Sequence, residues 1–134
     1  MKVIKVLGVA IVFFLAASCN QENEQEGLVS KWHLIEQLMD PGDGSGTFQP
    51  VTSDKTLSFF EDGTFCSQNG SVCIGDLWSG GESSSGTYSE TSMTMDVSDC
   101  TGGHVPLSYE MDGGFHVLNY ACIKACREKY EQIN

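Results

Sequence analysis

Cysteines are the residues of this 134-residue chain with the clearest chemistry, and five of its six lie beyond residue 60. In an exported protein they would meet an oxidising compartment, where disulfide bonds form in preference to metal thiolates. Cys66 and Cys73 flank a glycine-containing loop, which predicts a first disulfide between them. A second would join Cys100 to either Cys122 or Cys126, and one thiol would remain unpaired.

Two other groups of side chains invite a metal. A glycine-rich stretch carries four oxygen-bearing residues that would suit calcium: Asp40, Asp43, Ser45 and Asp54. The EF-hand register fails, because counting from Asp43 puts Phe48 where glycine is required and Asp54 in place of the bidentate glutamate. A glycine turn closing a long connection is the preferred interpretation.

Zinc is the second alternative, with Cys122 and Cys126 joined by His104 or His116. Three residues separate the two cysteines and no second close pair supports them, so a disulfide is favoured. We therefore expect neither a metal nor a cofactor. Catalytic residues are not expected either, because the chain has no G-x-S-x-G nucleophile motif, and its glycine-rich stretch at residues 79–82 lacks the lysine of a phosphate loop.

The N-terminal segment has the three-part layout of a secretory signal. Lys2 and Lys5 precede an apolar run, residues 6–15, and three small residues then lead to Cys19. A membrane-spanning helix is the alternative, but the uncharged run of about 14 residues is shorter than the roughly 20 that a span needs. The sequence therefore predicts a removable signal peptide at residues 1–18.

Leu15-Ala16-Ala17-Ser18-Cys19 resembles the lipobox of bacterial lipoproteins, whose cysteine is acylated and becomes the new N-terminus. Most lipoboxes place a bulky aliphatic residue where this chain has Ala16, so cleavage without acylation is the alternative. The resemblance implies a lipid anchor at Cys19, carrying fatty acyl chains such as palmitate, and a cell-envelope location at the outer membrane, in either leaflet. Residues 19–27 would form a flexible acidic tether.

Residues 28–134 are enough for one domain. Without the signal peptide the chain keeps five basic and eighteen acidic residues, a formal charge of −13. So acidic a protein repels phosphate backbones, which argues against nucleic acid as a partner.

Glycine turns at short intervals and alternating apolar residues predict an all-β protein. Residues 28–39 also fit helical spacing, but we expect a strand there. The predicted strands lie near residues 29–37, 55–60, 64–68, 85–89, 92–97, 104–111, 114–120 and 127–132. Eight short strands suit a small antiparallel barrel, whose closure removes exposed sheet edges.

One hairpin has two possible turns. A two-residue turn at residues 62–63 would place Phe60 opposite Phe65, whereas a three-residue turn at residues 61–63, with Gly63 left-handed, would pair Phe59 with Phe65. We prefer the second, because it puts Leu57, Phe59 and Phe65 on one face of the sheet.

A strand with a tryptophan behind an N-terminal tether, a loop at residues 40–51, and the segments 57–65, 85–88 and 122–130 together resemble the small lipocalin-like lipoproteins of Bacteroidetes. The likeness covers nearly all of residues 28–131. It implies an eight-stranded up-and-down barrel whose closed end is plugged by Trp32. Ser30 replaces the glycine that usually stands two places before this tryptophan, which leaves the geometry of the barrel base open.

The leading functional hypothesis is a monomeric, membrane-anchored binding protein that holds a small apolar or amphipathic ligand at the open end of its barrel and performs no reaction. The alternative is a structural or interaction protein of the cell envelope, with a solid core and a protein partner that contacts loops such as residues 67–85. A protease inhibitor is a third, weaker interpretation. Candidate lining residues share an apolar character and an inward position: Trp32, Leu34, Phe59, Phe65, Tyr88, Met93, Met95, Leu107 and Tyr109.

Overall fold

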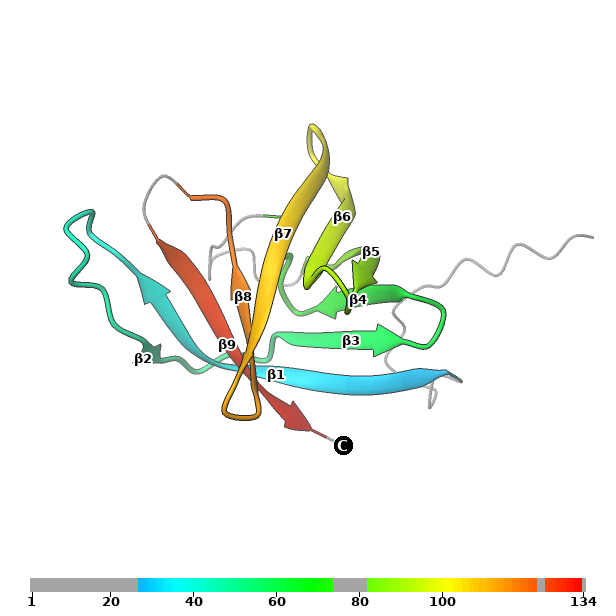
Figure 1. Cartoon of the computed structure of the whole chain (residues 1–134), viewed down its shortest axis with the longest axis horizontal. Helices are drawn as coiled ribbons and strands as arrows, with labels where there is room; N and C mark the ends of the chain where they lie inside the picture. Colours follow the sequence, from blue (N-terminus) through cyan, green and yellow to red (C-terminus); the bar gives the residue numbers. More distant parts are fainter. Residues whose placement is uncertain (1–26, 74–81, 123–124, 134) are drawn as a thin grey trace, which may run out of the picture.

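The computed structural model describes residues 27–73, 82–122 and 125–133, and the strands within these ranges belong to one sheet (Figure 1). Their bounds are β1 Leu28–Met39, β2 Gln49–Pro50, β3 Thr56–Phe60, β4 Thr64–Gln68, β5 Ser84–Ser89, β6 Thr94–Cys100, β7 Gly103–Asp112, β8 Phe115–Asn119 and β9 Cys126–Ile133. No helix in the described ranges is long and apolar enough to cross a membrane.

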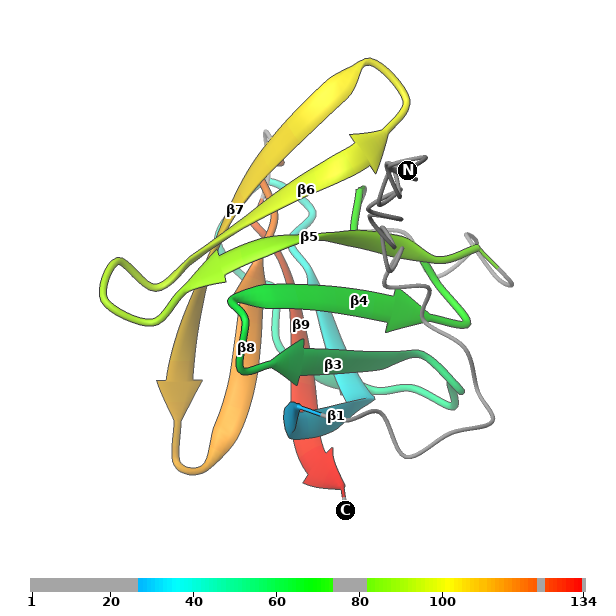
Figure 2. The same cartoon turned by 90° about the vertical axis from the view of Figure 1, so that its right-hand side faces the viewer.

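The sheet closes on itself as an antiparallel barrel of eight strands. From β3 to β9 each strand pairs with the next in the chain, and β1 pairs with both β3 and β9. In Figure 2, β3, β4 and β5 form a near wall whose strands run across those of β8 and β9 behind it. The predicted all-β up-and-down barrel is confirmed.

All eight predicted strands are present, with ends that differ from the prediction by a few residues. The short β2 was not predicted. Its two residues pair with Glu36 and Gln37 of β1, whose earlier residues, 28–33, pair with β3. β2 therefore extends the wall beyond the start of β3, and the loop that contains it folds back onto the barrel.

The hairpin between β3 and β4 has the preferred three-residue turn. Phe59 pairs with Phe65, and Gly63 has a left-handed φ of 83°. The Asp62 carboxylate accepts a hydrogen bond from the backbone N–H of Thr64 at 3.0 Å. Leu57, Phe59 and Phe65 are all buried, as this register requires.

A β-bulge in β1 changes which side chains face the interior. Leu34 pairs with Tyr130 but Glu36 pairs with Lys129, so the register shifts between them. Strict alternation along β1 would put Leu38 on the same face as Trp32 and Leu34. The bulge instead buries Gln37, which is 5% exposed.

The core fills the barrel with alternating side chains, and one glycine makes room for them. A Cβ atom on Gly86 of β5 would lie 1.9 Å from the carbonyl oxygen of Asp96 and 3.0 Å from the ring of Phe65. Only glycine fits this close approach of β5 and β6. The predicted signal peptide, Cys19 and most of the tether lie outside the described residues, as does most of the glycine-rich stretch at residues 79–82.

Candidate functional site

A largely apolar pocket opens at the end of the barrel that holds the start of β1 and the β3–β4, β5–β6 and β7–β8 turns. Its volume is about 290 Å³. Ten residues line it: Val29, Ser30, Trp32, Phe59, Tyr88, Glu90, Met93, Tyr109, Met111 and His116. The volume lies close to the lower limit of ordinary small-molecule sites, about 300 Å³.

Five of the nine candidate lining residues meet at this pocket: Trp32, Phe59, Tyr88, Met93 and Tyr109. The other four pack deeper in the hydrophobic core: Leu34, Phe65, Met95 and Leu107. Met93 precedes β6 with a left-handed φ of 55°, which is unusual for a non-glycine residue. The β5–β6 turn therefore brings this methionine to the mouth.

Trp32 has a different place from the one its resemblance implied. The resemblance implies that it plugs the closed end of the barrel. Instead it lines the pocket at the open end, as expected of a candidate lining residue, and its indole N–H donates to Ser30 Oγ at 3.0 Å. The opposite end of the barrel is filled by other residues. There Lys55 and Glu128, 3% and 0% exposed, form a buried ion pair, with Nζ 3.1 Å from each carboxylate oxygen.

Two tyrosines complete this buried ionic cluster of Lys55, Glu128, Tyr120 and Tyr130. Both phenols donate to Glu128 Oε2, from Tyr120 at 2.6 Å and from Tyr130 at 2.5 Å. Burial, with the nearby Glu128 carboxylate, raises the pKa of both tyrosines well above the ordinary value. The cluster fills the barrel's interior at that end.

His116 lies among aromatic rings at the inner part of the pocket. It stacks on Tyr109 with ring centroids 4.6 Å apart, and Phe59 and Trp32 follow at 5.3 and 5.7 Å. The Tyr130 ring meets it edge-on at 6.1 Å, which joins the pocket to the buried ionic cluster.

Both ring nitrogens of His116 are buried without a hydrogen-bond partner among the described residues. The side chain is 3% exposed, and burial lowers its pKa to about 4, so the ring is neutral at pH 7. A buried polar group without a partner costs about 1–3 kcal/mol. Sequence reasoning considered His116 only as a zinc ligand, although alternation along the strand puts it on the same face as Leu118.

The hydroxyl groups of the two tyrosines in the wall are already paired. The Tyr88 hydroxyl donates to the Phe60 carbonyl at 2.7 Å, and that of Tyr109 to the Ser89 carbonyl at 3.3 Å. Burial raises the pKa of Tyr88, and the carboxylates of Glu90, Asp62 and Glu61 raise it further. These three acids give the mouth a negative potential.

Acidification should destabilise the protein through His116. In the unfolded chain the His116 ring binds a proton near pH 6.5, whereas in the folded chain its pKa is about 4. Protonation therefore favours the unfolded chain below pH 6.5, and the free energy of unfolding falls as the pH drops from 6.5 toward 4. The loss should reach at most about 3.5 kcal/mol, at roughly 1.4 kcal/mol per pKa unit.

Urea unfolding at pH 7.5 and pH 4.5 measures this loss. His116→Phe should show a smaller loss than the wild type, and His104→Phe, at an exposed site, the same loss as the wild type. An equal pH dependence in wild type and His116→Phe would contradict the assignment.

The disulfides differ from the predicted pairs. Cys73 is bonded to Cys100 and Cys122 to Cys126, with Cα atoms 5.5 and 6.0 Å apart. The bonds predicted from Cys66 to Cys73, and from Cys100 to Cys122 or Cys126, are therefore wrong. No cysteine in the described part of the chain is free, so the expected unpaired thiol is wrong too.

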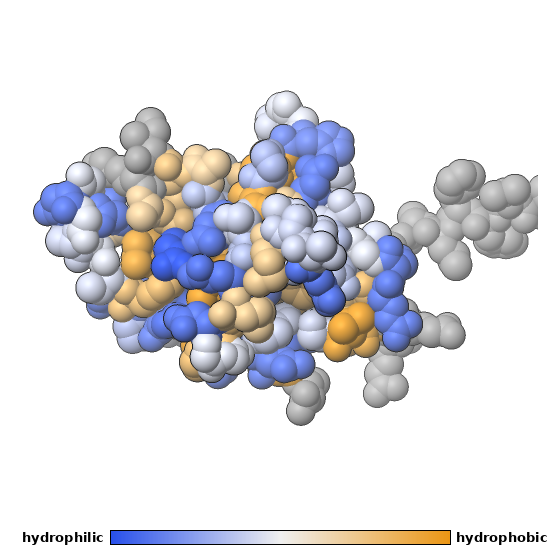
Figure 3. Space-filling model, in the orientation of Figure 1, coloured by the Kyte–Doolittle hydropathy of each residue, from blue (hydrophilic) through white to orange (hydrophobic). Residues whose placement is uncertain are grey.

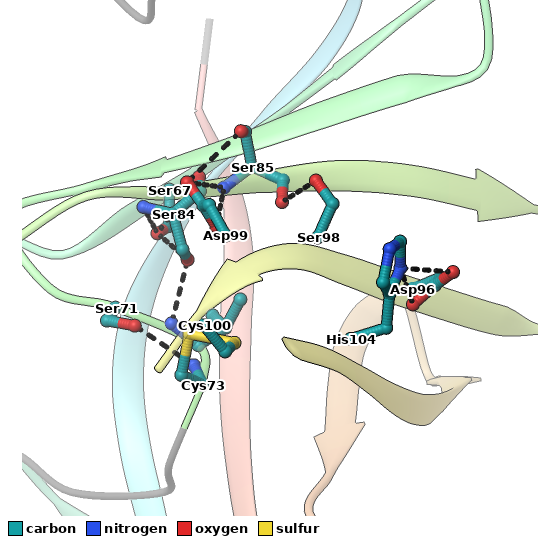
Figure 4. The surroundings of a disulfide bond; sticks show 11 residues. Ser67, Ser71, Cys73, Ser84, Ser85, Asp96, Ser98, Asp99, Cys100 and His104 are labelled. Carbon is teal, nitrogen blue, oxygen red and sulfur yellow. Dashed lines mark hydrogen bonds and ion pairs between the residues drawn. A yellow bond between two sulfur atoms is a disulfide. The ribbon is translucent and has the colours of Figure 1, made fainter. Parts of the chain in front are cut away.

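Serines surround the Cys73–Cys100 bond (Figure 4). The backbone N–H of Val72 donates to Ser84 Oγ at 3.0 Å, and Ser84 Oγ lies 2.6 Å from Ser67 Oγ. These contacts hold the chain after β4 against the start of β5. The bond to Cys100 thereby fixes it to the end of β6, at the end of the barrel opposite the pocket.

The carboxylates of Asp40 and Asp43, which we considered as calcium ligands, instead accept hydrogen bonds that shape the loop after β1. The Asp40 carboxylate accepts backbone hydrogen bonds from Gly46, Gly42 and Gly44, which hold its pKa below the usual value. Asp43 accepts from the side chain and the backbone of Ser45. Cys122 and Cys126 are bonded to each other, which leaves neither thiolate for zinc.

Comparison of the chain with protein-family models, with curated proteins and with solved structures found no match.

Proposed function

We propose that this protein is a lipid-anchored binding protein that holds one small apolar or amphipathic molecule in the pocket at the mouth of its barrel. The observation that carries the proposal is the pocket of about 290 Å³ whose wall is formed by Trp32, Phe59, Tyr88, Tyr109 and methionines. Aromatic and methionine side chains favour apolar ligands, and methionine adapts its shape to them.

Binding without catalysis fits the chemistry of the wall. His116, a buried titratable group of the wall, has aromatic rings as its neighbours, namely Trp32, Phe59, Tyr109 and Tyr130. A general base would need a nucleophile or a proton-bearing substrate group within hydrogen-bond reach, and the tyrosine hydroxyls of the wall donate to backbone carbonyls.

The lipid anchor is predicted from the sequence alone. The predicted tether ends at Gly27, just before β1 of the barrel. The Gly27 carbonyl accepts a hydrogen bond from the backbone N–H of Glu61, in the β3–β4 turn, at 2.8 Å. A tether from an acylated Cys19 would thus meet the barrel at its mouth. An apolar molecule dissolved in the outer membrane would then have a short path to the pocket.

The likeness to lipocalin-like lipoproteins agrees with a ligand at one end of an up-and-down barrel, and we retain it as part of the proposal. A solid core with a purely structural role is less favoured, because a packed interior leaves voids far smaller than this pocket.

A second hollow, of about 320 Å³, lies over the exposed residues Thr94, Pro106 and Ser108 on the outside of the barrel.

The outer surface offers a protein partner no broad apolar area on the face drawn in Figure 3, where hydrophobic residues form separate patches among hydrophilic ones. Three of the exposed large apolar residues, Leu28, Val29 and Met111, belong to strand ends at the mouth. Exposed apolar side chains around a pocket entrance suit an apolar ligand that passes them.

The uncharged fluorescent probe N-phenyl-1-naphthylamine tests the proposal. Its emission should rise saturably with one site per chain. Met111→Trp should weaken its binding by roughly tenfold or more, about 1.4 kcal/mol, because the larger ring would occupy space at the mouth that the probe needs. Met39→Trp is the matched control, because Met39 is an exposed methionine outside the pocket and at the far end of β1.

Titration of the purified wild-type chain and both variants measures these affinities. Trp78→Phe would isolate the fluorescence of Trp32, which should change as the probe binds. No saturable binding by the wild type, or equal affinities for the two methionine variants, would contradict the proposal.

A further inference from the structure

The structure points to the kind of polar group on the ligand. We infer that the pocket takes a neutral molecule, an apolar body bearing one hydroxyl or carbonyl group, which forms a hydrogen bond with the ring of His116. This inference rests on the proposed binding function and narrows it to one class of ligand.

His116 is the buried polar group of the wall without a partner in the described residues. Trp32, Tyr88 and Tyr109 have their polar atoms bonded to Ser30, Phe60 and Ser89. Buried polar atoms are almost always paired in folded proteins, so the ring nitrogens call for a partner beyond the described residues. A ligand in the pocket that His116 lines can supply it.

Aromatic neighbours hold the His116 ring in position. Tyr109 covers one face at a centroid distance of 4.6 Å, and Phe59 and Trp32 restrict its tilt from other directions. A ring held this way keeps its nitrogens in a fixed orientation. Its hydrogen bond with a ligand would be directional and would cost little ordering entropy.

The neutral His116 ring and the acids at the mouth favour an uncharged ligand. A neutral imidazole offers one N–H donor and one nitrogen acceptor, which match a hydroxyl or a carbonyl. Burial keeps the ring neutral at pH 7, with a pKa of about 4. An anionic ligand would instead leave its charge in an apolar pocket beside Glu90, with Glu61 and Asp62 close to the same mouth. Burying a carboxylate without a cationic partner is costly, so the site selects against it.

Three naphthalenes that share one ring system test the inference: 2-naphthol, 2-methylnaphthalene and 2-naphthoate. Calorimetric titration of the purified chain at pH 7 should rank 2-naphthol first. 2-Naphthoate should bind more weakly than 2-naphthol by roughly tenfold or more, because its carboxylate would be desolvated without a partner. Glu90→Gln should narrow that difference by removing one of the repelling charges.

His116→Phe keeps an aromatic ring and removes both nitrogens. It should reduce the ratio of the 2-naphthol affinity to that of 2-methylnaphthalene by about threefold to tenfold, as expected for one hydrogen bond. His104→Phe is the matched control and should leave this ratio unchanged, because His104 is an exposed histidine that pairs with Asp96 outside the pocket.

Nitrogen NMR of the wild-type chain provides a measurement that does not depend on a folded variant. The ring resonances of His116 should move on addition of 2-naphthol, in the direction of a new hydrogen bond, and much less with 2-methylnaphthalene. Equal binding of all three compounds, with His116 resonances that respond alike, would overturn the inference but leave the binding function standing. Failure of all three to bind would overturn the binding function and the inference with it.

Discussion

Replacing Lys55 by methionine is expected to lower the free energy of unfolding by about 3–5 kcal/mol, the cost of leaving a buried charge without its partner. Lys55 Nζ lies 3.1 Å from both carboxylate oxygens of Glu128, and these side chains are 4% and 0% exposed. Without the ammonium, the phenols of Tyr120 and Tyr130 would still donate to Glu128. They would not neutralise its charge.

Urea unfolding followed by circular dichroism measures the effect, and two further variants control it. Lys129→Met removes a lysine from a partly exposed pair with Glu36, at 2.7 Å, and should cost about 1 kcal/mol or less. Combining Lys55→Met with Glu128→Leu replaces the whole pair by apolar groups and should recover most of the loss. A single Lys55→Met variant no less stable than Lys129→Met would show that Glu128 is not held as a buried anion.

The buried ionic cluster also bears on function, because it occupies the interior at one end of the barrel and leaves the space for a ligand at the other. The Tyr130 ring contacts both Glu128, through its hydroxyl, and His116, through its edge. A loosened cluster would therefore displace the inner wall of the pocket. Titrating Lys55→Met with N-phenyl-1-naphthylamine would measure whether loosening the buried ionic cluster changes ligand affinity.

The barrel itself could be predicted from local patterns. Apolar residues alternate with polar ones at Met95 and Val97, and again at Leu107 and Tyr109. This pattern marks strands that are buried on one face. The turn at residues 61–63 was predictable because its register alone keeps Leu57, Phe59 and Phe65 together. Each of these signals lies within one strand or one hairpin.

What escaped prediction depends on long-range contacts. Lys55 and Glu128 are 73 residues apart, and nothing near either residue indicates that they meet. The bulge after Leu34 shifts the inward face of β1 by one residue and turns Gln37 inward, which strict alternation cannot anticipate. The His116 ring nitrogens lack hydrogen-bond partners among the described residues because rings from β1, β3 and β7 surround them, and only the folded barrel brings these rings together.

The disulfides were mispredicted for a related reason. Nearness in sequence favoured a bond between Cys66 and Cys73, but Cys66 lies within β4 and Cys73 in the segment that follows it. That segment reaches past β5 to the end of β6, where Cys100 lies 27 residues further along the chain. Sheet order brings these two cysteines together, and sequence spacing does not reveal it.

Removal of the Cys73–Cys100 bond is the second large effect that we expect. The double variant Cys73→Ala with Cys100→Ala should lower the free energy of unfolding by about 3–4 kcal/mol, because the bond closes a loop with a sequence separation of 27. The double variant Cys122→Ala with Cys126→Ala, whose separation is four, should lose only about 2 kcal/mol. The bond that closes the longer loop should contribute more, because it removes more conformational entropy from the unfolded chain.

Paired alanine variants are better suited to this test than a reductant, which would act on every disulfide at once. Each double variant removes one cysteine of the core, Cys100 or Cys126; of their partners, Cys73 is partly buried against the core and Cys122 is exposed, so some of the larger loss comes from packing. Urea unfolding of both should give the larger loss for the longer loop. Because the Cys73–Cys100 bond lies at the end away from the pocket, affinity for N-phenyl-1-naphthylamine should persist in the folded variant. A larger loss from the shorter loop would show that local packing, rather than loop closure, sets the contribution of these bonds.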